Sequence, residues 1–562
     1  MVRFSEKLFL TLIATTLLLP AALMIWVHFA NPPEQFDWIA NRTLAGVTVK
    51  KDPPKVGLGG WLKGELQNGL SNLVSENFGG RELLIRTYNE VLYRAFAKSY
   101  MSSELIIAGK DGNLFSSEYL ADYGRYFGRV PAEETEALVI VMKYISERLK
   151  ELGSSFVLVI TPSKATVYPE DIPLRYLANI KNGERSPTNY DILVRLLKEY
   201  GVPYVDGRQI TLEHKETLPV RAFPKTGIHW SRAVAFFTAA ELLRTIERAS
   251  GWQMPHLSES VERIDQVPDY ADDDLFRLMN LIQKPHQQYL HPKIQTLNSG
   301  HRRNGILTSV GGSFMDTILE DLTSAQVFER MNHYSYFKVS RCRYPDRLVS
   351  SVDESSIPWD EDFWNTRAVV LEANEEAIGA RHLRAFLMAA LVAFNKEVPR
   401  EPSVDDSFRP LAWGFGEDEN GNALVKRGFS SQEHQMTWIS GPDAEVELPS
   451  PMQNTDLRLI LEAVPSLGGG VSARVVTIEA NGNPVGALEL VATSVEFYSL
   501  TIKAALNATP SLKLHFSIVP SSGAVRHDGS RELGLAGVAL VPIKHPANQE
   551  AAENHLDVVN RK

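Results

Sequence analysis

The chain has 562 residues, which is too long for one hydrophobic core, so two or three domains are expected. With 44% hydrophobic and 22% charged residues, the composition is that of a folded globular protein and gives no sign of disorder. A formal net charge of −10 disfavours nonspecific binding of nucleic acid, which needs basic patches to displace counterions from phosphates. The single cysteine, Cys342, excludes an intrachain disulfide and a zinc site built from cysteine pairs.

Residues 8–30 form an uncharged apolar run that follows Arg3 and Lys7. At ~1.5 Å per residue, a helix of this length can cross a hydrocarbon layer of roughly 30 Å. The basic residues before it predict a cytoplasmic N-terminus. We therefore expect residues 1–30 to be a single-pass anchor in a bacterial inner membrane, with the bulk of the chain periplasmic. A cleaved signal peptide is the alternative.

Residues 31–60 are rich in proline and glycine and are expected to be a linker. After them, residues 61–400 are expected to form one α/β domain, because helical patterns alternate with apolar runs of strand length. Helices are predicted at 61–100, 132–152, 189–200, 231–247 and after 372, and strands at 156–161, 202–205, 306–310 and 368–372. An Asp-Gly turn within residues 105–115 predicts a β-hairpin. This order predicts a parallel sheet with helices on both faces.

The pattern changes near Pro402. Residues 410–545 show short alternating strands separated by turns, which is typical of an antiparallel β-sandwich. The strands are predicted at 445–448, 457–463, 473–480, 487–490, 498–502, 512–518 and 537–542. The polar residues 546–562 are expected to be a loose tail.

The sharpest local feature is the end of the apolar run at 306–310, where Gly311 and Gly312 precede Ser313. Glycines allow a tight turn, and the serine then opens a helix at the carboxyl end of a strand, where open α/β sheets bind ligands. Backbone N–H groups at a helix start can stabilise an oxyanion. Ser313 is therefore a candidate nucleophile, with Gly311 and Gly312 beside it. The alternative is a serine that only caps the helix.

A second loop places His229 just before a helix, between Thr226 and Trp230. A serine nucleophile needs a base near neutral pH, and histidine is the usual one, although a lone histidine is often only structural. Lys164 lies in a third loop that also follows a strand. Because the carboxyl ends of parallel strands share one edge, Lys164, Thr226 and Trp230 are expected to line the same site. No metal-ligand spacing or phosphate-binding loop stands out.

Taken together, six short segments between about residues 75 and 395 resemble the AlgX/AlgJ family of alginate O-acetyltransferases with SGNH-hydrolase-like domains. The segments are Asn77-Phe78-Gly79-Gly80-Arg81, Gly109-Lys110-Asp111-Gly112-Asn113-Leu114-Phe115, Pro162-Ser163-Lys164, Gly227-Ile228-His229-Trp230-Ser231, Gly311-Gly312-Ser313-Phe314 and Val369-Val370-Leu371-Glu372. The resemblance implies that Ser313 is the nucleophile and His229 the base. It also implies transfer of acetyl groups to a polysaccharide, without a cofactor of the protein's own, since the acetyl group comes through a membrane-bound O-acyltransferase partner.

The sequence departs from this family at Gly227, because the family's triad usually has aspartate two residues before the histidine. Without a carboxylate, a histidine loses the group that fixes its tautomer. Asp206, just after a predicted strand, is one substitute, and a backbone carbonyl is another. Reduced or lost activity is therefore part of the expectation.

Three functions follow from these observations. The first is an O-acetyltransferase of an extracytoplasmic polysaccharide, working with a membrane-bound O-acyltransferase and other synthesis or secretion proteins. The second is an esterase that removes acetyl groups with the same residues. The third is a non-catalytic scaffold, in which a degenerate SGNH domain and the β-sandwich, a candidate carbohydrate-binding domain, hold the polymer.

Overall fold

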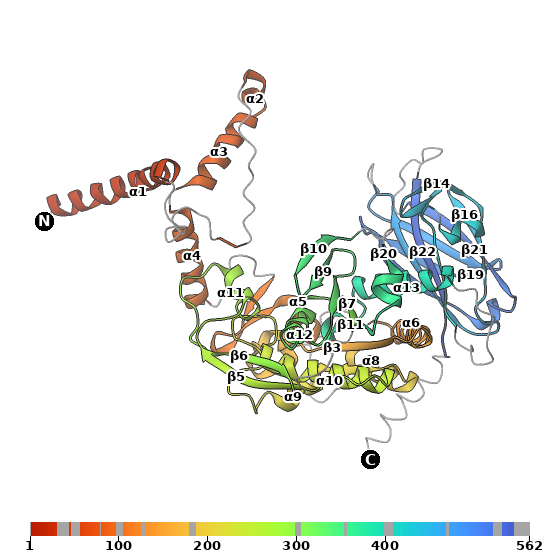
Figure 1. Cartoon of the computed structure of the whole chain (residues 1–562). Coiled ribbons are helices and arrows are strands. Elements are labelled where there is room, and N and C mark those ends of the chain that lie inside the picture. Colours follow the sequence, from red (N-terminus) through yellow and green to blue (C-terminus); the bar gives the residue numbers. More distant parts are fainter. Residues whose placement is uncertain are drawn as a thin grey trace, which may run out of the picture.

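The computed structural model describes residues 2–30, 44–45, 57–78, 80–96, 105–124, 130–178, 187–297, 305–352, 357–397, 409–417, 419–467, 471–520 and 531–544. In Figure 1 these residues form N-terminal helices at the upper left, an α/β part in the centre and a β part at the right. The predicted linker at 31–60 lies outside the described residues except for 44–45 and 57–60. The predicted tail at 546–562 lies wholly outside them.

Among the described residues, four helices precede the α/β part: α1 (Val2–Ala30), α2 (Leu58–Leu62), α3 (Glu65–Asn77) and α4 (Arg81–Phe96). A helix that crosses a membrane must combine sufficient length with apolar side chains, because a polar group in hydrocarbon costs several kcal/mol. Within the described part of the chain, no helix meets both conditions. This finding contradicts the predicted inner-membrane anchor at 1–30, and with it the predicted localisation.

A seven-stranded sheet in the order β10-β9-β8-β7-β11-β3-β4 lies at the centre of the α/β part (Figure 1). The strands from β8 to β4 are parallel, whereas β9 and β10 extend one edge in the antiparallel direction. The sheet is thus mixed, and the prediction of a parallel sheet holds for five of its strands. The bounds are β3 (Ser155–Thr161), β4 (Tyr204–Asp206), β7 (Ile306–Gly311), β8 (Arg330–Ser335), β9 (Ser340–Tyr344), β10 (Leu348–Ser351) and β11 (Ala368–Asn374).

Helices cover both faces of this sheet, and β3 shows why. Its alternate residues Phe156, Leu158 and Ile160 join a core with α6, α8 and α13, whereas Val157 and Val159 join a second core with α10 and α12. A strand buried on both faces therefore reads as one continuous apolar run. The helices are α6 (Ala132–Glu151), α7 (Lys164–Val167), α8 (Asn189–Tyr200), α9 (Gly207–His214), α10 (Arg232–Ser250), α12 (Ser313–Ser324) and α13 (Arg381–Glu397).

Two small hairpins lie beside the main sheet. One is the predicted hairpin with the Asp-Gly turn, and the other brackets a segment that contains the short helix α11. The elements are β1 (Ile106–Ala108), β2 (Leu114–Ser116), α5 (Ser117–Tyr123), β5 (Leu257–Asp265), α11 (Asp274–Met279) and β6 (Tyr289–Thr296).

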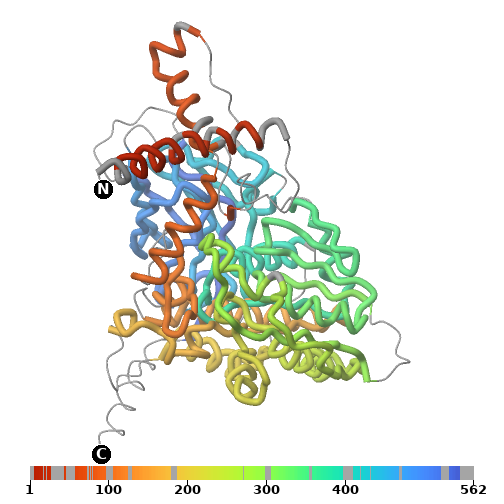
Figure 2. Tube along the Cα trace, turned by 90° about the vertical axis from the view of Figure 1, so that its left-hand side faces the viewer, coloured from red at the N-terminus to blue at the C-terminus, as the bar shows by residue number. Residues whose placement is uncertain are grey.

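Helix α4 stands next to α11, as Figures 1 and 2 both show. The amide of Asn89 donates to the carbonyl oxygen of Met279 at 2.9 Å, and Arg86 donates to that of Leu281 at 3.0 Å. The backbone N–H of Ile282 donates to the carboxylate of Glu90 at 2.8 Å. These bonds attach α4 to the segment that carries α11.

The β part consists of two antiparallel sheets, β14-β15-β22-β17-β20 with β12 beside β22, and β13-β16-β21-β18-β19. Buried residues of both sheets form one core, as expected for a sandwich. The bounds are β12 (Leu411–Gly414), β13 (Val425–Arg427), β14 (Phe429–Glu433), β15 (Met436–Ser440), β16 (Asp443–Pro449), β17 (Leu457–Pro465), β18 (Arg474–Ala480), β19 (Asn483–Leu490), β20 (Glu496–Ile502), β21 (Ser511–Pro520) and β22 (Arg531–Pro542).

The β part packs directly on the α/β part. Ala539 and Val541 of β22 belong to the same apolar core as α6 and α13. At the edge of this contact, Arg458 lies 3.4 Å from Glu133 and 3.5 Å from Glu134, two carboxylates at the start of α6. The two parts are therefore joined by apolar packing and by ion pairs.

Candidate active site

Ser313 and His229 face each other across the carboxyl edge of the main sheet. Strand β7 ends at Gly311 and α12 begins at Ser313, so the serine stands at the start of a helix. Its Oγ lies 2.7 Å from Nε2 of His229. The structure thus brings together the two residues that the sequence singled out, at the distance a proton transfer needs.

The turn before Ser313 is clamped by Glu372 of β11. This carboxylate is buried and accepts a hydrogen bond from the N–H of Gly312 at 2.7 Å and another from the hydroxyl of Thr161 at 2.5 Å. Burial raises the pKa of Glu372. A Cβ at position 311 would lie 2.7 Å from the Cβ of Glu372, so only glycine fits there.

This clamp bears on the expected oxyanion donors. Because the N–H of Gly312 is donated to Glu372, it does not point to a substrate oxygen in this arrangement. The N–H of Ser313 is the first of α12, and the first N–H groups of a helix have no acceptor within it. Of the N–H groups expected near Gly312 and Ser313, that of Ser313 is therefore the one that remains a candidate donor.

The other nitrogen of His229 is bonded to a carboxylate that the sequence did not predict. Nδ1 lies 2.7 Å from Oδ2 of Asp274, the first residue of α11. Oδ1 of Asp274 accepts from the N–H of Ile228 at 2.9 Å and of Leu275 at 2.7 Å. The carboxylate is thus fixed on three sides, and it holds the imidazole with Nε2 toward Ser313.

Gly227 explains why the carboxylate comes from a different segment. A Cβ at this position would lie 2.7 Å from the carbonyl oxygen of Asp272 and 2.8 Å from that of Ala271. The segment leading into α11 therefore occupies the space that a side chain at 227 would need. The same close approach brings Asp274 to His229.

Thr226 joins these two segments instead of lining the cleft. Its hydroxyl donates to the carbonyl oxygen of Asp272 at 2.8 Å, and its own carbonyl accepts from the N–H of Phe276 at 3.0 Å. The side chain is fully buried. Thr226 thus holds the histidine loop against α11.

Lys164 holds the same loop from the other side. Its Nζ donates to the carbonyl oxygens of Pro224 at 2.6 Å, Lys225 at 3.0 Å and Gly227 at 3.1 Å. Burial lowers the pKa of Lys164 well below its ordinary value. The structure therefore places Lys164 under the loop, where it orders the backbone before His229.

Aromatic rings pack behind the histidine. Phe314 lies with its ring centre 4.8 Å from that of His229. Trp230 is 1% exposed and packs 6.0 Å from the ring centre of Phe314. These rings limit the rotation of the imidazole, and Trp230, although nearly fully buried, also lines the cleft beside His229.

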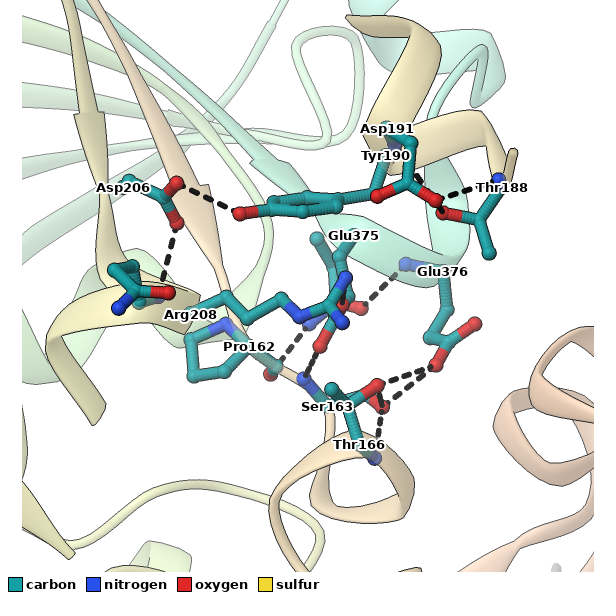
Figure 3. A network of polar contacts seen from close by, with 12 residues as sticks. Pro162, Ser163, Thr166, Thr188, Tyr190, Asp191, Asp206, Arg208, Glu375 and Glu376 are labelled. Carbon is teal, nitrogen blue, oxygen red and sulfur yellow. Dashed lines mark hydrogen bonds and ion pairs between the residues drawn. The ribbon is translucent and has the colours of Figure 1, made fainter. Parts of the chain in front are cut away.

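Asp206, the substitute proposed from the sequence, lies in a different network (Figure 3). Its Oδ2 accepts from the hydroxyl of Tyr190 at 2.7 Å, and its Oδ1 accepts from the N–H of Gln209 at 3.0 Å, which caps α9. The carboxylate on His229 belongs to Asp274, so the structure corrects the choice of Asp206. The reason is local: the side chain at the end of β4 is used to cap the helix that follows.

Ser163 belongs to the same network and has two carboxylate partners (Figure 3). Its N–H donates to Glu375 at 2.7 Å and its hydroxyl donates to Glu376 at 2.7 Å. Glu375 also pairs with Arg208 at 3.1 Å. This loop thus has a structural role beside the site.

A cleft of about 590 Å³ opens at Ser313 and His229. Several polar side chains line it, from α10, α12, β8, β9 and the loops after β5 and β9: Arg232, Asp269, Asp316, Glu320, His333, Ser335, Ser340, Cys342, Tyr344 and Arg347. Ser313 is therefore accessible from a cleft that offers several polar side chains.

Comparison with known proteins gives one family match. Residues 106–305 match the model described as SGNH hydrolase-like domain, acetyltransferase AlgX. This range contains His229 and Asp274 and ends before Ser313. No curated protein matches the chain.

Solved structures give more distant similarities. The O-acetyltransferase domain of Pseudomonas putida AlgJ is 17% identical with a TM-score of 0.33, over 49% of this chain and 93% of that one. Pseudomonas aeruginosa AlgX is 12% identical with a TM-score of 0.35, over 78% and 94%. Bacillus cereus PatB1 is 12% identical with a TM-score of 0.32, over 50% and 99%. The family match over residues 106–305 confirms the resemblance to the SGNH hydrolase-like AlgX acetyltransferase family that the sequence motifs predicted.

Proposed function

We propose that the protein is an O-acetyltransferase that moves an acetyl group onto a hydroxyl of a polysaccharide through Ser313. The observation that carries this proposal is the continuous hydrogen-bonded line from Asp274 through His229 to Ser313, with both contacts to the imidazole at 2.7 Å. Nucleophile, base and orienting carboxylate are the three parts that acyl transfer by serine requires. The family match agrees with this chemistry.

In the first half-reaction, Oγ of Ser313 attacks the acetyl carbonyl carbon of the donor while Nε2 of His229 takes the hydroxyl proton. Asp274 stabilises the imidazolium that forms, because its carboxylate lies on Nδ1. The tetrahedral intermediate collapses when the bond to the leaving group breaks and His229 returns the proton to that group. The acetyl group is then an ester of Ser313.

In the second half-reaction, a sugar hydroxyl loses its proton to His229 and attacks the acetyl-serine. The new ester leaves on the sugar, and the proton returns to Oγ of Ser313. The N–H of Ser313, at the start of α12, is the candidate donor to the oxyanion in both steps. We infer that a membrane-bound O-acyltransferase partner supplies the acetyl group and that polysaccharide synthesis or secretion proteins present the polymer.

The test uses the purified full chain with 4-nitrophenyl acetate as donor and an oligosaccharide as acceptor. Ser313→Ala is expected to lower the release of 4-nitrophenol at least about 10³-fold, because the acyl-enzyme cannot form. Ser324→Ala, an exposed serine on the same helix, is the matched control and should keep the wild-type rate. Equal rates for wild type and Ser313→Ala would overturn the proposal.

Mass analysis of the products separates the remaining candidates. An acetylated oligosaccharide supports transfer, whereas free acetate alone indicates the esterase. A non-catalytic scaffold was suggested by the missing aspartate at position 227, but Asp274 supplies a carboxylate at the same nitrogen. That candidate would be supported by polymer binding without any Ser313-dependent turnover.

A further inference from the structure

The cleft at Ser313 contains more carboxylates than cations. Asp269, Asp272, Asp274, Asp316 and Glu320 line it, against the two arginines Arg232 and Arg347. Burial raises the pKa of Asp272 to about 7. Burial also raises the pKa of Asp316. Even without these two residues, the three carboxylates of Asp269, Asp274 and Glu320 face two arginines, so the groove carries net negative charge.

Both arginines already contact carboxylates of α12. Arg232 donates to Asp321 through Nε at 3.1 Å and Nη2 at 3.0 Å. Arg347 donates to Glu320 at 2.6 Å. A charge-assisted pair of this kind reduces what either guanidinium offers to an incoming anion.

The strand pattern of β9 directs two further arginines away from the cleft. Ser340, Cys342 and Tyr344 line the groove, whereas Arg341 and Arg343 alternate with them and so point to the opposite face. Arg341 pairs there with Asp362 at 2.9 Å. Strand β9 thus offers uncharged groups to the cleft, and Arg347, in the turn after it, is the cation that this edge contributes.

The groove is also rich in hydrogen-bond acceptors. The carboxylate of Asp316, one helical turn after Ser313, accepts from Tyr344 at 3.4 Å, and an ionised carboxylate can only accept. His333 is 1% exposed, and its Nε2 has no hydrogen-bond partner among the described residues and lies 3.8 Å from Asp316. Burial lowers the pKa of His333 to about 4, which keeps the ring neutral.

From this lining we propose that the acceptor is a glycan without negative charge, built of neutral or amino sugars, and not a polyuronate. Hydroxyl and ammonium groups donate hydrogen bonds to carboxylates, whereas a sugar carboxylate offers only acceptors and like charge. The proposal rests on the proposed function, since it assigns the acceptor of the same Ser313 site.

The test measures acetyl transfer from 4-nitrophenyl acetate to three oligomers of equal length: a neutral hexose oligomer, a uronic acid oligomer and the methyl ester of that uronic acid oligomer. The methyl ester has the same rings without the charge. Transfer to the neutral oligomer and to the methyl ester should exceed transfer to the free acid at least about tenfold, because like charges at close range are strongly disfavoured. Equal or preferred transfer to the free uronate would overturn the proposal.

A charge variant tests whether the cleft causes the preference. Asp316→Asn should lower, several-fold, the ratio of acetyl transfer to the methyl ester over acetyl transfer to the free acid. Added salt should lower the same ratio in the wild type. Glu213→Gln removes one charge from α9, outside the cleft lining, and should leave the ratio unchanged. Because each ratio is measured within one variant, any change in the rate of ester cleavage cancels. A ratio that Asp316→Asn leaves unaltered would contradict a role of the cleft.

Failure of this inference can be told apart from failure of the proposed function. If Ser313→Ala releases 4-nitrophenol as fast as the wild type, the proposed site is wrong. If the wild type cleaves the donor but acetylates no oligomer, transfer is wrong, and the charge preference is measured as inhibition of cleavage by the three oligomers. Inhibition by the free uronate as strong as that by its methyl ester then overturns the charge preference as well.

Discussion

At the scale of single residues, substitution of two aspartates is expected to have very different effects on kcat. Asp274 lies on Nδ1 of His229, whereas Asp206 caps α9 and accepts from Tyr190. Asp274→Asn should lower kcat for 4-nitrophenyl acetate about 10²–10⁴-fold, because the amide favours the wrong tautomer and cannot stabilise the imidazolium. Asp206→Asn should change kcat less than about twofold, since asparagine also caps a helix. The pH profile of kcat gives the readout, and a larger loss for Asp206→Asn would reassign the carboxylate.

Substitution of Gly227 is expected to lower both the stability of the protein and its kcat. Gly227→Asp writes the family's usual aspartate into the sequence, but its Cβ would meet backbone oxygens of Ala271 and Asp272 at 2.8 and 2.7 Å. We expect a loss of about 1–3 kcal/mol of stability and a lower kcat, because the backbone must move apart at the point where Asp274 is delivered.

The matched control is Gly59→Ala, where nothing lies within 4 Å of the added Cβ. Thermal unfolding measures the stability of each variant, and ester turnover measures its kcat. A Gly227→Asp variant more active than the wild type would show that the aspartate two residues before the histidine is the better partner, and that Asp274 is a weak substitute.

The pair Ser313 and His229 could be predicted from sequence because each lies in a short motif next to a predicted strand or helix. Asp274 could not, because 45 residues separate it from His229 and only the tertiary fold joins them. Its one local signal is the run Asp272-Asp273-Asp274 before an apolar helical segment, which reads equally well as a helix cap. Gly227 is a second, indirect signal of the close approach of the segment that carries Asp274, since a glycine at that position allows another backbone to approach.

At the scale of secondary-structure elements, the loop after β3 positions the loop before His229, because Lys164 donates hydrogen bonds to its backbone. Lys164→Met should lower kcat at least about tenfold and KM less, because three carbonyl oxygens lose their donor and the backbone before His229 is released. Rescue by Lys164→Arg is not expected, because the buried site is shaped for a compact ammonium. A crystal structure of Lys164→Met and separate measurements of its kcat and KM check this prediction. An unchanged kcat would mean that Lys164 contributes only to the stability of the protein.

A carboxyl group in the loop after β11 is expected to make the stability of the protein depend on pH. Burial, a hydrogen bond with Asp122 and the charge of Glu375 raise the pKa of Glu376 well above its ordinary value. The folded protein therefore holds a proton that the unfolded chain loses above about pH 4.3, so this group lowers stability as pH rises. Glu376→Gln should make the fall in stability between about pH 5 and 8 less steep.

Urea unfolding of wild type and variant at several pH values measures this slope. Glu213→Gln, an exposed carboxylate on α9, should leave the slope as in the wild type. A Glu376→Gln variant with a steeper fall than the wild type would mean that Glu376 is ionised in the folded protein.

Elements with a strong periodic pattern were the predictable ones. The apolar run of β3 and the alternating strands from β16 to β22 lie within a few residues of their predicted positions. Strand β8 and the antiparallel strands β9 and β10 beside it were missed, because β8 contains the polar residues Asn332 and His333 and β10 is exposed. The edge depends on a tight turn in which Tyr336 and Phe337 adopt φ values of 48° and 56°.

At the scale of the whole molecule, the α/β part and the β-sandwich share a core, and this predicts joint unfolding. Ala539 and Val541 of the sandwich lie in one apolar cluster with α6 and α13. Calorimetry should therefore show one cooperative transition for both parts. Arg458→Leu should lower stability by roughly 2–4 kcal/mol, because Glu133 and Glu134 lose a nearly buried partner.

Arg244→Leu is the control for the loss of one positive charge, since Arg244 is an exposed residue of α10 away from this contact. Its transition should match that of the wild type. Two separate transitions in the wild type would show that the shared core does not couple the parts. The sequence predicted both parts but not this coupling, because the small side chains of β22 fit either a sandwich core or an interface.

The attachment of α4 to α11 sets a practical limit on fragments of this protein. A fragment cut at residue 106, where the family match begins, keeps Ser313, His229 and Asp274. It loses the bonds from Asn89 to Met279 and from Arg86 to Leu281, which hold the far end of the segment that delivers Asp274. Such a fragment can fold and still misplace its carboxylate, so an expression plasmid for enzymology should start before α4, at or before residue 80.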